Sequence, residues 1–190
     1  NLRQIGLAIR LYSHEHNHFL PATTHSTGSR RVHQSWVYSI APYLGNEPGK
    51  IDIVRVCPAE PEERRKRILS ENATSYGLNE LVFDTEEFHH LLRIPRPAHT
   101  LLAVIFSEKR TPSPTWDHVH SGEWTTWDKM LNDVAVDRHG TGGDPHGSPE
   151  ERIHGSSNYL YADGHAENIA ARKMKTIVDS GTNPAAVPLE

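Results

Sequence analysis

The sequence predicts an α+β fold in which a leading helix packs on an antiparallel sheet that carries long loops. Three observations support this prediction: helical periodicity over residues 1–12, an apolar run over residues 100–106, and an Asp-Gly hairpin that joins residues 158–162 to 165–169. Helices and strands that do not alternate regularly are typical of α+β domains. Because 190 residues are enough for one well-buried core and hardly for two, residues 1–190 are interpreted as a single domain.

The first predicted element is a helix that begins at once, at Asn1, and ends near residues 16–18. No start signal precedes its apolar run, although capping residues or turns normally mark the beginning of a helix. We therefore expect it to be the C-terminal part of a longer helix. The apolar positions at helical spacing are Leu2, Ile5, Ile9 and Tyr12, which predict the face that packs on the sheet.

Short elements separated by loops are predicted for the next part of the chain. Residues 22–33 are rich in Thr, Ser, Gly and Arg, which is typical of a loop. Gly45 is expected to stop the helix that precedes it. The elements expected here are a helix over residues 34–44, a strand over 52–57, an exposed helix over 60–70 and a β-like segment over 74–79.

The strongest strand pattern of the chain lies at residues 100–106. After Thr100 its side chains are apolar at consecutive positions, which predicts a central strand that is buried on both faces. Residues 107–157 contain prolines and glycines and show no sustained periodicity. They are interpreted as a mostly irregular insertion within the domain.

The last strong signal is the hairpin near the end of the chain. Asp163 and Gly164 predict a two-residue type I′ turn, in which both central residues adopt positive φ. In that register Leu160 lies opposite Glu167 on one face of the hairpin. A short helix over residues 170–178 is expected to follow.

Composition and charge exclude several function classes. The formal net charge is −4, and the only dense basic run, residues 64–67, follows acidic residues, so no nucleic-acid partner is predicted. The single cysteine, Cys57, excludes an internal disulfide and a cysteine-built zinc site, and it is interpreted as a small buried apolar residue. No run of the sequence is long and apolar enough to span a bilayer.

The histidines suggest a metal site, because the chain contains 14 of them. Residues two apart on a strand point to the same side, so His118 and His120, or Asp163 and His165, could hold one ion. Neither pair belongs to a specific zinc pattern. A zinc ion is therefore kept open as a cofactor, and so is a calcium ion bound by oxygen ligands of the loop-rich region.

Candidate residues for catalysis lack a supporting motif. Asp163, His139 and Ser156 could form a triad, but no nucleophile motif surrounds the serine. We therefore predict no catalytic residue and no enzyme, and a metal-binding hydrolase is the weakest alternative.

Three tryptophans close together in residues 107–157 allow another interpretation. Trp116, Trp124 and Trp127 lie near carboxylates, and exposed aromatic residues beside carboxylates suit carbohydrate or protein recognition. The same residues would equally well cover a minor core beneath the loop. Both interpretations are kept open.

Five short segments form an ordered set along the chain. They read Asn-Leu-Arg-Gln-Ile-Gly-Leu-Ala at 1–8, Val-Cys-Pro at 56–58, Thr-Ser-Tyr-Gly-Leu-Asn at 74–79, Arg-His at 138–139 and Asn-Tyr-Leu-Tyr-Ala-Asp-Gly-His at 158–165. This set resembles bacterial prepilin-type proteins that carry the processing-associated C-terminal signature H-X9-DG. The resemblance spans most of the chain, and the ordered set is more specific than any one segment.

The resemblance implies a pilin-like fold and a structural role. It implies a leader peptide and a transmembrane helix upstream of Asn1, a prepilin peptidase that cleaves the leader, and methylation of the new N-terminus. The expected partners are other pilin or pseudopilin subunits and the inner membrane. The full-length protein would be anchored in the cell envelope, with this domain periplasmic or extracellular, as part of a type II secretion or type IV pilus-like assembly.

Two histidines compete for the histidine position of the signature. Between His154 and Asp163 lie eight residues instead of nine, whereas between His139, in the usual Arg-His context, and Asp163 lie twenty-three. We interpret residues 140–153 as an insertion after His139. The sequence leaves open whether His139 or His154 corresponds to the histidine of the H-X9-DG signature.

Overall fold

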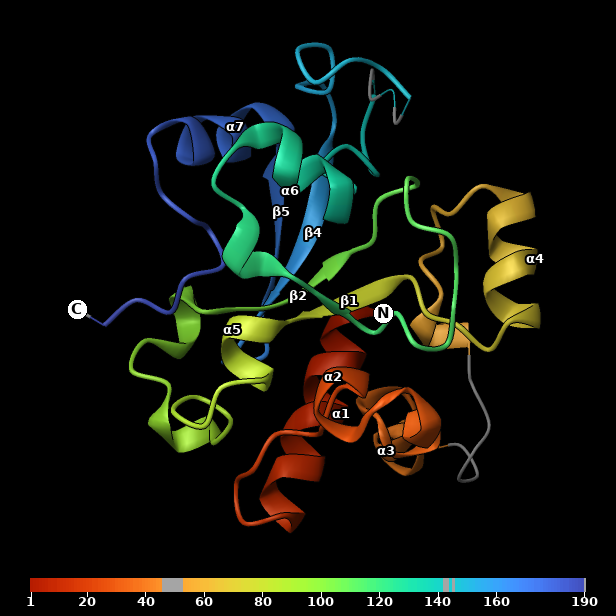
Figure 1. Cartoon of the computed structure of the whole chain (residues 1–190), viewed down its shortest axis with the longest axis vertical. Coiled ribbons are helices and arrows are strands. Elements are labelled where there is room, and N and C mark those ends of the chain that lie inside the picture. Colours follow the sequence, from red (N-terminus) through yellow and green to blue (C-terminus); the bar gives the residue numbers. More distant parts are fainter. Residues whose placement is uncertain (46–52, 142–143, 145, 190) are drawn as a thin grey trace.

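A five-stranded sheet forms the middle of the molecule, with strands in the order β3-β1-β2-β4-β5 (Figure 1). The computed structural model describes residues 1–45, 53–141, 144 and 146–189. Neighbouring strands are antiparallel except β3, which pairs with β1 in parallel, so the predicted antiparallel sheet is mixed at one edge. The strands are β1 Tyr76–Asn79, β2 Leu101–Ile105, β3 His118–Val119, β4 Ser156–Tyr161 and β5 Ala166–Ala170.

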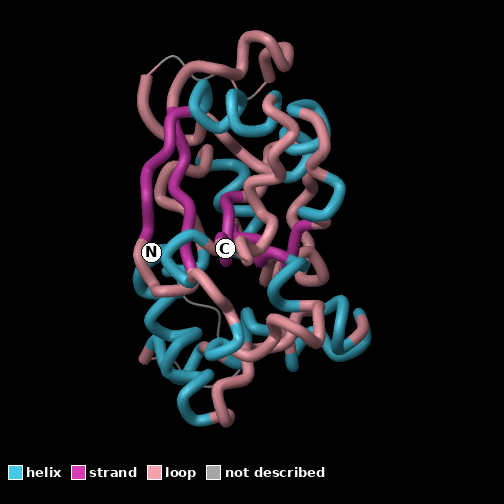
Figure 2. Tube along the Cα trace, turned by 90° about the vertical axis from the view of Figure 1, so that its left-hand side faces the viewer, coloured by secondary structure: helices cyan, strands magenta, loops and turns pink. Residues whose placement is uncertain are grey.

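Helices cover both faces of the sheet, which confirms the α+β prediction. The helix α1 (Leu2–Glu15) packs on one face, whereas α6 (Trp127–Asp133) and α7 (Ala171–Asp179) pack on the other. Figure 2 shows the strands between two groups of helices. Side chains alternate along β4: Tyr159 belongs to the core on the α6 side, and Leu160 belongs to the core on the α1 side.

The leading helix α1 forms as predicted and ends close to the predicted position. Its buried residues include Leu2, Ile5 and Ile9, so the stripe expected from the sequence is the face that packs on the sheet. A Cβ added at Gly6 would lie only 2.7 Å from Cδ1 of Leu160. The missing side chain at Gly6 therefore lets α1 lie close to β4.

The helix predicted over residues 34–44 is broken into two short pieces. The helix α3 (Trp36–Ser39) is followed by the 3₁₀ turn η2 (Ala41–Leu44). Pro42 lies in the first positions of η2 and has no amide hydrogen with which to continue the α-helical pattern. Gly45 ends η2 in a left-handed conformation with a φ of +79°, as predicted for a helix stop.

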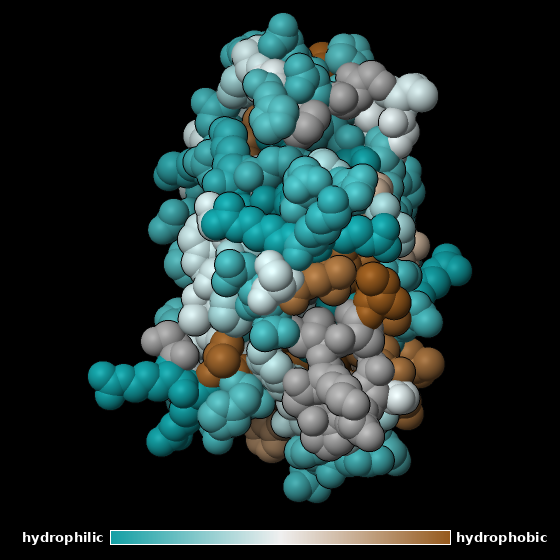
Figure 3. All heavy atoms as spheres, turned by 90° about the vertical axis from the view of Figure 1, so that its right-hand side faces the viewer, coloured by the Kyte–Doolittle hydropathy of each residue, from teal (hydrophilic) through white to brown (hydrophobic). Residues whose placement is uncertain are grey.

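The strand predicted over residues 52–57 is wrong for the described part of this segment. Residues Ile53–Arg55 form the 3₁₀ turn η3, and position 52 lies outside the described residues. A short apolar run does not distinguish a strand from a buried turn. The helix α4 (Glu62–Ser70) confirms the exposed helix predicted next, and Figure 3 shows a largely hydrophilic surface on this side of the molecule. The remaining short helices are α2 (Thr24–Thr27), η1 (Ser29–Gln34), α5 (Glu80–Phe83), η4 (Leu91–Arg93), η5 (Pro97–His99) and η6 (Ser121–Glu123).

The hairpin of β4 and β5 forms, but its turn and register differ from those predicted. Leu160 lies opposite Ala166, one residue away from the predicted pairing. The amide of Gly164 donates to the carbonyl oxygen of Tyr161 at 2.9 Å, and Gly164 has a φ of +93°. Asp163 is not among the residues with positive φ, as a type I′ turn would require. A three-residue loop with glycine in the left-handed position replaces the two-residue turn, and this shifts the pairing.

Residues 107–157 hold more regular structure than predicted, because β3, η6 and α6 lie within them. Trp124, Met130 and Leu131 from this interval belong to the core on the α6 side of the sheet. The interval therefore supplies much of the cover of one face. The predicted terminal helix is confirmed as α7. Within the described ranges, no helix combines the length and the apolar character that crossing a membrane requires.

Candidate functional site at the start of α1

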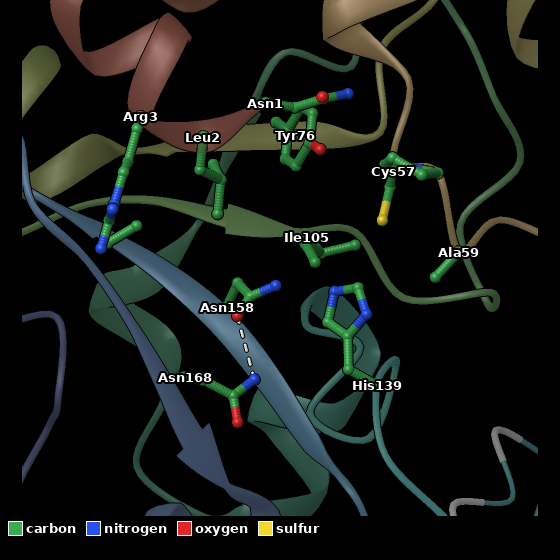
Figure 4. Close-up of a pocket in the computed structure, with 12 residues that line it drawn as sticks. Asn1, Leu2, Arg3, Cys57, Ala59, Tyr76, Ile105, His139, Asn158 and Asn168 are labelled. Carbon is green, nitrogen blue, oxygen red and sulfur yellow. Dashed lines mark hydrogen bonds between the residues drawn. The ribbon is translucent and has the colours of Figure 1, made fainter.

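The five segments of the ordered set meet at a hollow of about 660 Å³ beside the start of α1. Each segment contributes to its lining. Figure 4 shows Asn1, Tyr76 and Cys57 around one side of the hollow, and His139 and Asn158 on the other. Segments that are scattered along the sequence thus come together in one place, and this makes the hollow the candidate functional site.

Hydrogen bonds fix the start of α1 to the Cys-Pro segment. The side-chain amide of Asn1 donates to the carbonyl oxygen of Val56 at 2.8 Å. The backbone amide of Cys57 donates to Oγ of Ser75 at 2.9 Å. The carbonyl oxygen of Ser75 in turn accepts the amide of Phe106 at 2.8 Å, at the ends of β1 and β2. The start of α1 is therefore held to the sheet through the Cys-Pro segment.

The thiol of Cys57 is buried in the core, as expected from the sequence. Burial raises the pKa of the Cys57 thiol, so the neutral thiol dominates near neutral pH. Burial likewise raises the pKa of the neighbouring Tyr76 hydroxyl. Neither side chain supplies an activated nucleophile or a base to the hollow.

His139, not His154, lies at the hollow. The backbone of His139 pairs with that of Ser156 through two N–H···O bonds of 2.8 and 2.7 Å. The chain thus leaves the sheet at His139 and returns at Ser156, and Gly155, with a φ of +76°, turns it back. This closed loop agrees with an insertion after His139. His154 is exposed within that loop and does not line the hollow.

The imidazole of His139 is half-buried and lacks a hydrogen bond at Nε2 among the described residues. Burial, and then the positive charge of Arg138, lower the pKa of His139. The imagined triad does not form, because Asp163 bonds to Nδ1 of His165 at 2.6 Å instead of to His139. Among the described residues, no third potential metal ligand lies beside Asp163 and His165.

A buried group of charges adjoins the hollow. Nη1 of Arg138 lies 3.0 Å from Glu60 and 2.6 Å from Glu108, and Nε of Arg64 lies 3.2 Å from Glu60. Burial raises the pKa of Glu60, although the charges of Arg138 and Arg64 act in the opposite direction. Glu60 was expected at the beginning of an exposed helix, and this is wrong because it is only 6% exposed. Its partner Arg138 is too far along the chain for any local pattern to connect the two.

Asp163 and Gly164, which the resemblance assigns to the signature, lie in the hairpin turn, against the middle of α1. Nη1 of Arg10 donates to the carbonyl oxygen of Asp163 at 2.8 Å. The Cα atom of Gly164 is 3.5 Å from the point where a Cβ of Gly6 would lie. The two glycines therefore allow the turn and the helix to touch.

The predicted pair His118 and His120 lies at the β3 edge of the sheet, with ring centroids 5.2 Å apart. The structure adds His25 and Asp84, which the sequence analysis missed, because no sequence spacing links them to His118. Burial alone would lower the pKa of His118. The hydrogen bond to Asp117 and the charges of Asp117 and Asp84 outweigh it, and the pKa is raised.

The three tryptophans of residues 107–157 do not form one exposed surface. Trp124 and Trp127 are 1% and 4% exposed and belong to the core on the α6 side. Trp116 is 36% exposed, and the guanidinium of Arg110 lies 4.5 Å from the centre of its ring. The core interpretation is therefore correct for Trp124 and Trp127, and the recognition interpretation is wrong for them.

Comparison with known proteins links the first part of the chain to a family. Residues 1–49 match the model of a family described as a protein of unknown function, DUF1559. This family is associated with pilin-like, prepilin-type proteins. No curated protein and no solved structure matches the chain. The matched residues include α1, α2 and α3.

Proposed function

We propose that this protein is a non-enzymatic structural subunit of the pilin or pseudopilin type, which serves a type II secretion or type IV pilus-like assembly of the cell envelope. One observation carries the proposal: the five segments that resemble prepilin-type proteins meet where α1 begins. The match of residues 1–49 to a family associated with pilin-like proteins supports it.

In this proposal α1 is the C-terminal part of a longer helix, and the upstream part anchors the protein in the inner membrane. Asn1 fixes the start of α1 to the Cys-Pro segment, and Arg10 fixes its middle to the hairpin turn. A helix held at two points keeps a defined direction relative to the sheet. The head is thereby oriented by the upstream helix.

The outer face of α1 supplies contacts to neighbouring subunits in this proposal. Leu7 and Leu11 are one helical turn apart and remain 59% and 42% exposed. Adjacent exposed leucines on a helix favour a contact surface over a purely solvated face. The opposite stripe of α1 is already buried against the sheet.

The other function classes have less support. An enzyme would need an activated side chain at the hollow, and the pKa of the buried Cys57 thiol is raised while Nε2 of His139 lacks a hydrogen-bond partner in the described chain. An aromatic recognition module would need its tryptophans exposed, but Trp124 and Trp127 are buried.

Processing of the full-length gene product in its native host tests the proposal. We expect a short leader to be removed only when the host's prepilin peptidase is present, and the new N-terminus to be methylated. Mass spectrometry of the N-terminal peptide measures both events, and membrane fractionation measures the location. A signal peptide that is removed without the prepilin peptidase would contradict the proposal.

Assembly gives a second measurement. The double substitution Leu7→Lys and Leu11→Lys is expected to deplete the protein from the sheared filament or pseudopilus fraction, because charges replace the apolar contact. Leu92→Lys is the matched control, since Leu92 is 69% exposed and lies outside α1. If Leu92→Lys depleted the protein equally, the outer face of α1 would have no specific role in assembly.

A further inference from the structure

Three side chains from separate segments meet beside the β3 edge of the sheet. His25 lies in α2, Asp84 directly follows α5, and His118 lies in β3. Each offers one ligand atom, and these three atoms lie within 4.8 Å of one another. The rings of His25 and His118 stack with centroids 5.4 Å apart, and Nδ1 of His25 is 3.7 Å from Oδ2 of Asp84. None of the three residues lines the hollow at the start of α1.

Only one oxygen of the Asp84 carboxylate has hydrogen-bond partners. Oδ1 accepts from Oγ1 of Thr23 at 2.6 Å and from Oγ of Ser26 at 2.7 Å. The Asp84 side chain is 9% exposed, and Oδ2 is buried without a hydrogen bond from any residue that the structure describes. A buried carboxylate oxygen without a partner is costly, so this oxygen is suited to a cation.

His118 is held in the orientation that a metal ligand needs. Its Nδ1 lies 2.9 Å from Oδ1 of Asp117, which is fully buried. The Asp117 carboxylate is itself fixed by Thr24, whose backbone amide donates at 3.0 Å and whose Oγ1 donates at 2.7 Å. With Nδ1–H bonded to a carboxylate, Nε2 of His118 is the free ligand atom. This arrangement is typical of the residues that surround metal-binding histidines.

We propose that His25, Asp84 and His118 bind a divalent transition-metal ion, for which zinc is the best match. Two imidazoles and one carboxylate are the donor types that zinc accepts, and they leave a fourth position. The inference stands independently of the proposed function, because it rests on side chains outside the hollow.

Binding requires only a small adjustment of the side chains. A tetrahedral zinc ion with bonds of about 2.0–2.1 Å separates its ligand atoms by about 3.4 Å. Separations of up to 4.8 Å must therefore shrink, and His25, which is exposed, is free to move toward the two less exposed ligands. The ring of His120 is centred 5.2 Å from that of His118 and 6.2 Å from that of His25. His120 or a water molecule takes the fourth position.

The bound ion would act as a structural clamp. It joins the loop segment around α2 and the end of α5 to β3, an edge strand of only 2 residues. An ion that binds the folded chain and not the unfolded one raises the stability of the fold.

Zinc titration of the untagged 190-residue chain tests the site. The protein is stripped with a chelator and titrated with zinc in competition with a chromophoric indicator, and its melting temperature is measured with and without zinc. We expect each chain to bind one equivalent of zinc tightly, and we expect zinc to raise the melting temperature. His25→Ala and Asp84→Asn should each abolish the tight equivalent, and Asp117→Asn should weaken it about 10–100-fold by releasing His118.

The matched control is His165→Ala. His165 has the same kind of bond as His118, from Nδ1 to the carboxylate of Asp163, but no third ligand joins it among the described residues. This variant should retain the tight equivalent. His25 is exposed, so His25→Ala is expected to keep the fold, which the melting temperature of the zinc-free protein verifies.

Two results would overturn the proposal. One is weak binding of several ions that His25→Ala does not change, which would mean an adventitious ion only. The other is a tight equivalent that survives both His25→Ala and Asp84→Asn, which would place the ion elsewhere among the histidines.

Discussion

The two faces of the sheet are covered by different means. On one face a helix of 14 residues, α1, presents a continuous apolar stripe to the core, to which the short helices α3 and α5 also contribute. On the other face the cover comes from α7 and from short pieces of residues 107–157, such as α6 with 7 residues. The first face thus has a helix of 14 residues, whereas the helices α6 and α7 on the second face have 7 and 9 residues.

On the second face, buried polar contacts help to hold the shorter elements in place. Nε1 of Trp124 donates to Oδ2 of Asp133 at 2.9 Å. Nη2 of Arg152 lies 2.6 Å from Oδ1 of Asp137, and both side chains are 1% exposed. The long helix α1 is placed mainly by burial of its stripe, with added hydrogen bonds at Asn1 and Arg10, whereas the shorter elements of the second face depend more on directional bonds.

The largest expected effect comes from breaking the buried ion pair on the second face. Arg152→Met should lower the free energy of unfolding by about 3–5 kcal/mol, because it leaves the Asp137 carboxylate buried without its partner. Urea denaturation followed by tryptophan fluorescence measures the change. The double variant Arg152→Met and Asp137→Leu should recover most of the loss, since neither charge is then buried.

An exposed ion pair provides the control for this experiment. Lys66 lies 2.9 Å from Glu62 on the outer side of α4. Lys66→Met is expected to leave the denaturation midpoint unchanged, because solvent screens the pair. If Lys66→Met and Arg152→Met had equal effects, the distinction between buried bonds and surface charges would fail.

The second largest effect tests the apolar contact on the α1 face. Leu160 is fully buried beneath α1, and Leu160→Ala should cost about 3 kcal/mol. Gly6→Ala should also destabilise, by roughly 1 kcal/mol, because its methyl group would lie 2.7 Å from Cδ1 of Leu160. In the double variant the new methyl group enters the space that Leu160 vacates.

The double variant should therefore lose less than the sum of the two single losses, by about 0.5–3 kcal/mol. Urea denaturation of the wild-type protein, the two single variants and the double variant measures every free energy of this double-mutant cycle. Strict additivity would mean that Gly6 and Leu160 do not share a packing contact.

The comparison of the two faces also explains what could be predicted from the sequence. The stripe of α1 and the strand β2 are local patterns, and both were predicted with nearly correct bounds. The strand β3 has 2 residues and pairs with a distant segment, so no periodicity could reveal it. The hairpin register was wrong because Asp-Gly fits a two-residue and a three-residue loop equally well, and only the backbone conformation of Asp163 decides between them.

The candidate site was predictable only in part. The resemblance supplied the segments that contain Cys57, Tyr76 and His139, but it did not indicate that they line one hollow. The partners of Glu60 and the cluster of Asp84 with two histidines join residues that are far apart in the chain. Such contacts depend on the tertiary fold, so the spacing of residues along the sequence does not predict them.

A smaller effect is expected from one directional bond of the second face. Trp124→Phe keeps the aromatic packing but removes the Nε1–H that bonds to Asp133. Because Asp133 also pairs with Arg110, the loss should be modest, about 1–2 kcal/mol of unfolding free energy. Trp116→Phe is the control, since Trp116 is exposed and should change stability by less than about 0.5 kcal/mol. Equal effects of the two variants would contradict the role of the buried bond.

The smallest effect concerns His139, a polar side chain at the edge of the α1 face. A histidine in the unfolded chain has a pKa of about 6.5. In the folded protein burial, and then Arg138, lower the pKa of His139. Below pH ~6.5 the unfolded state therefore binds more protons than the folded state, and the free energy of unfolding falls as the pH falls.

His139→Gln removes this source of acid sensitivity. Between pH 7 and 5 the variant should lose less stability than the wild-type protein, as measured by denaturation at a series of pH values. His154→Gln is the control, because His154 is exposed in the loop outside the hollow, and this variant should follow the wild-type profile. If the stability of His139→Gln changed with pH as that of the wild-type protein does, this would mean that the hollow admits the charged imidazole of His139. The α1 face would then tolerate an ionised group without a bonded partner, unlike the α6 face, where Asp137 is paired with Arg152.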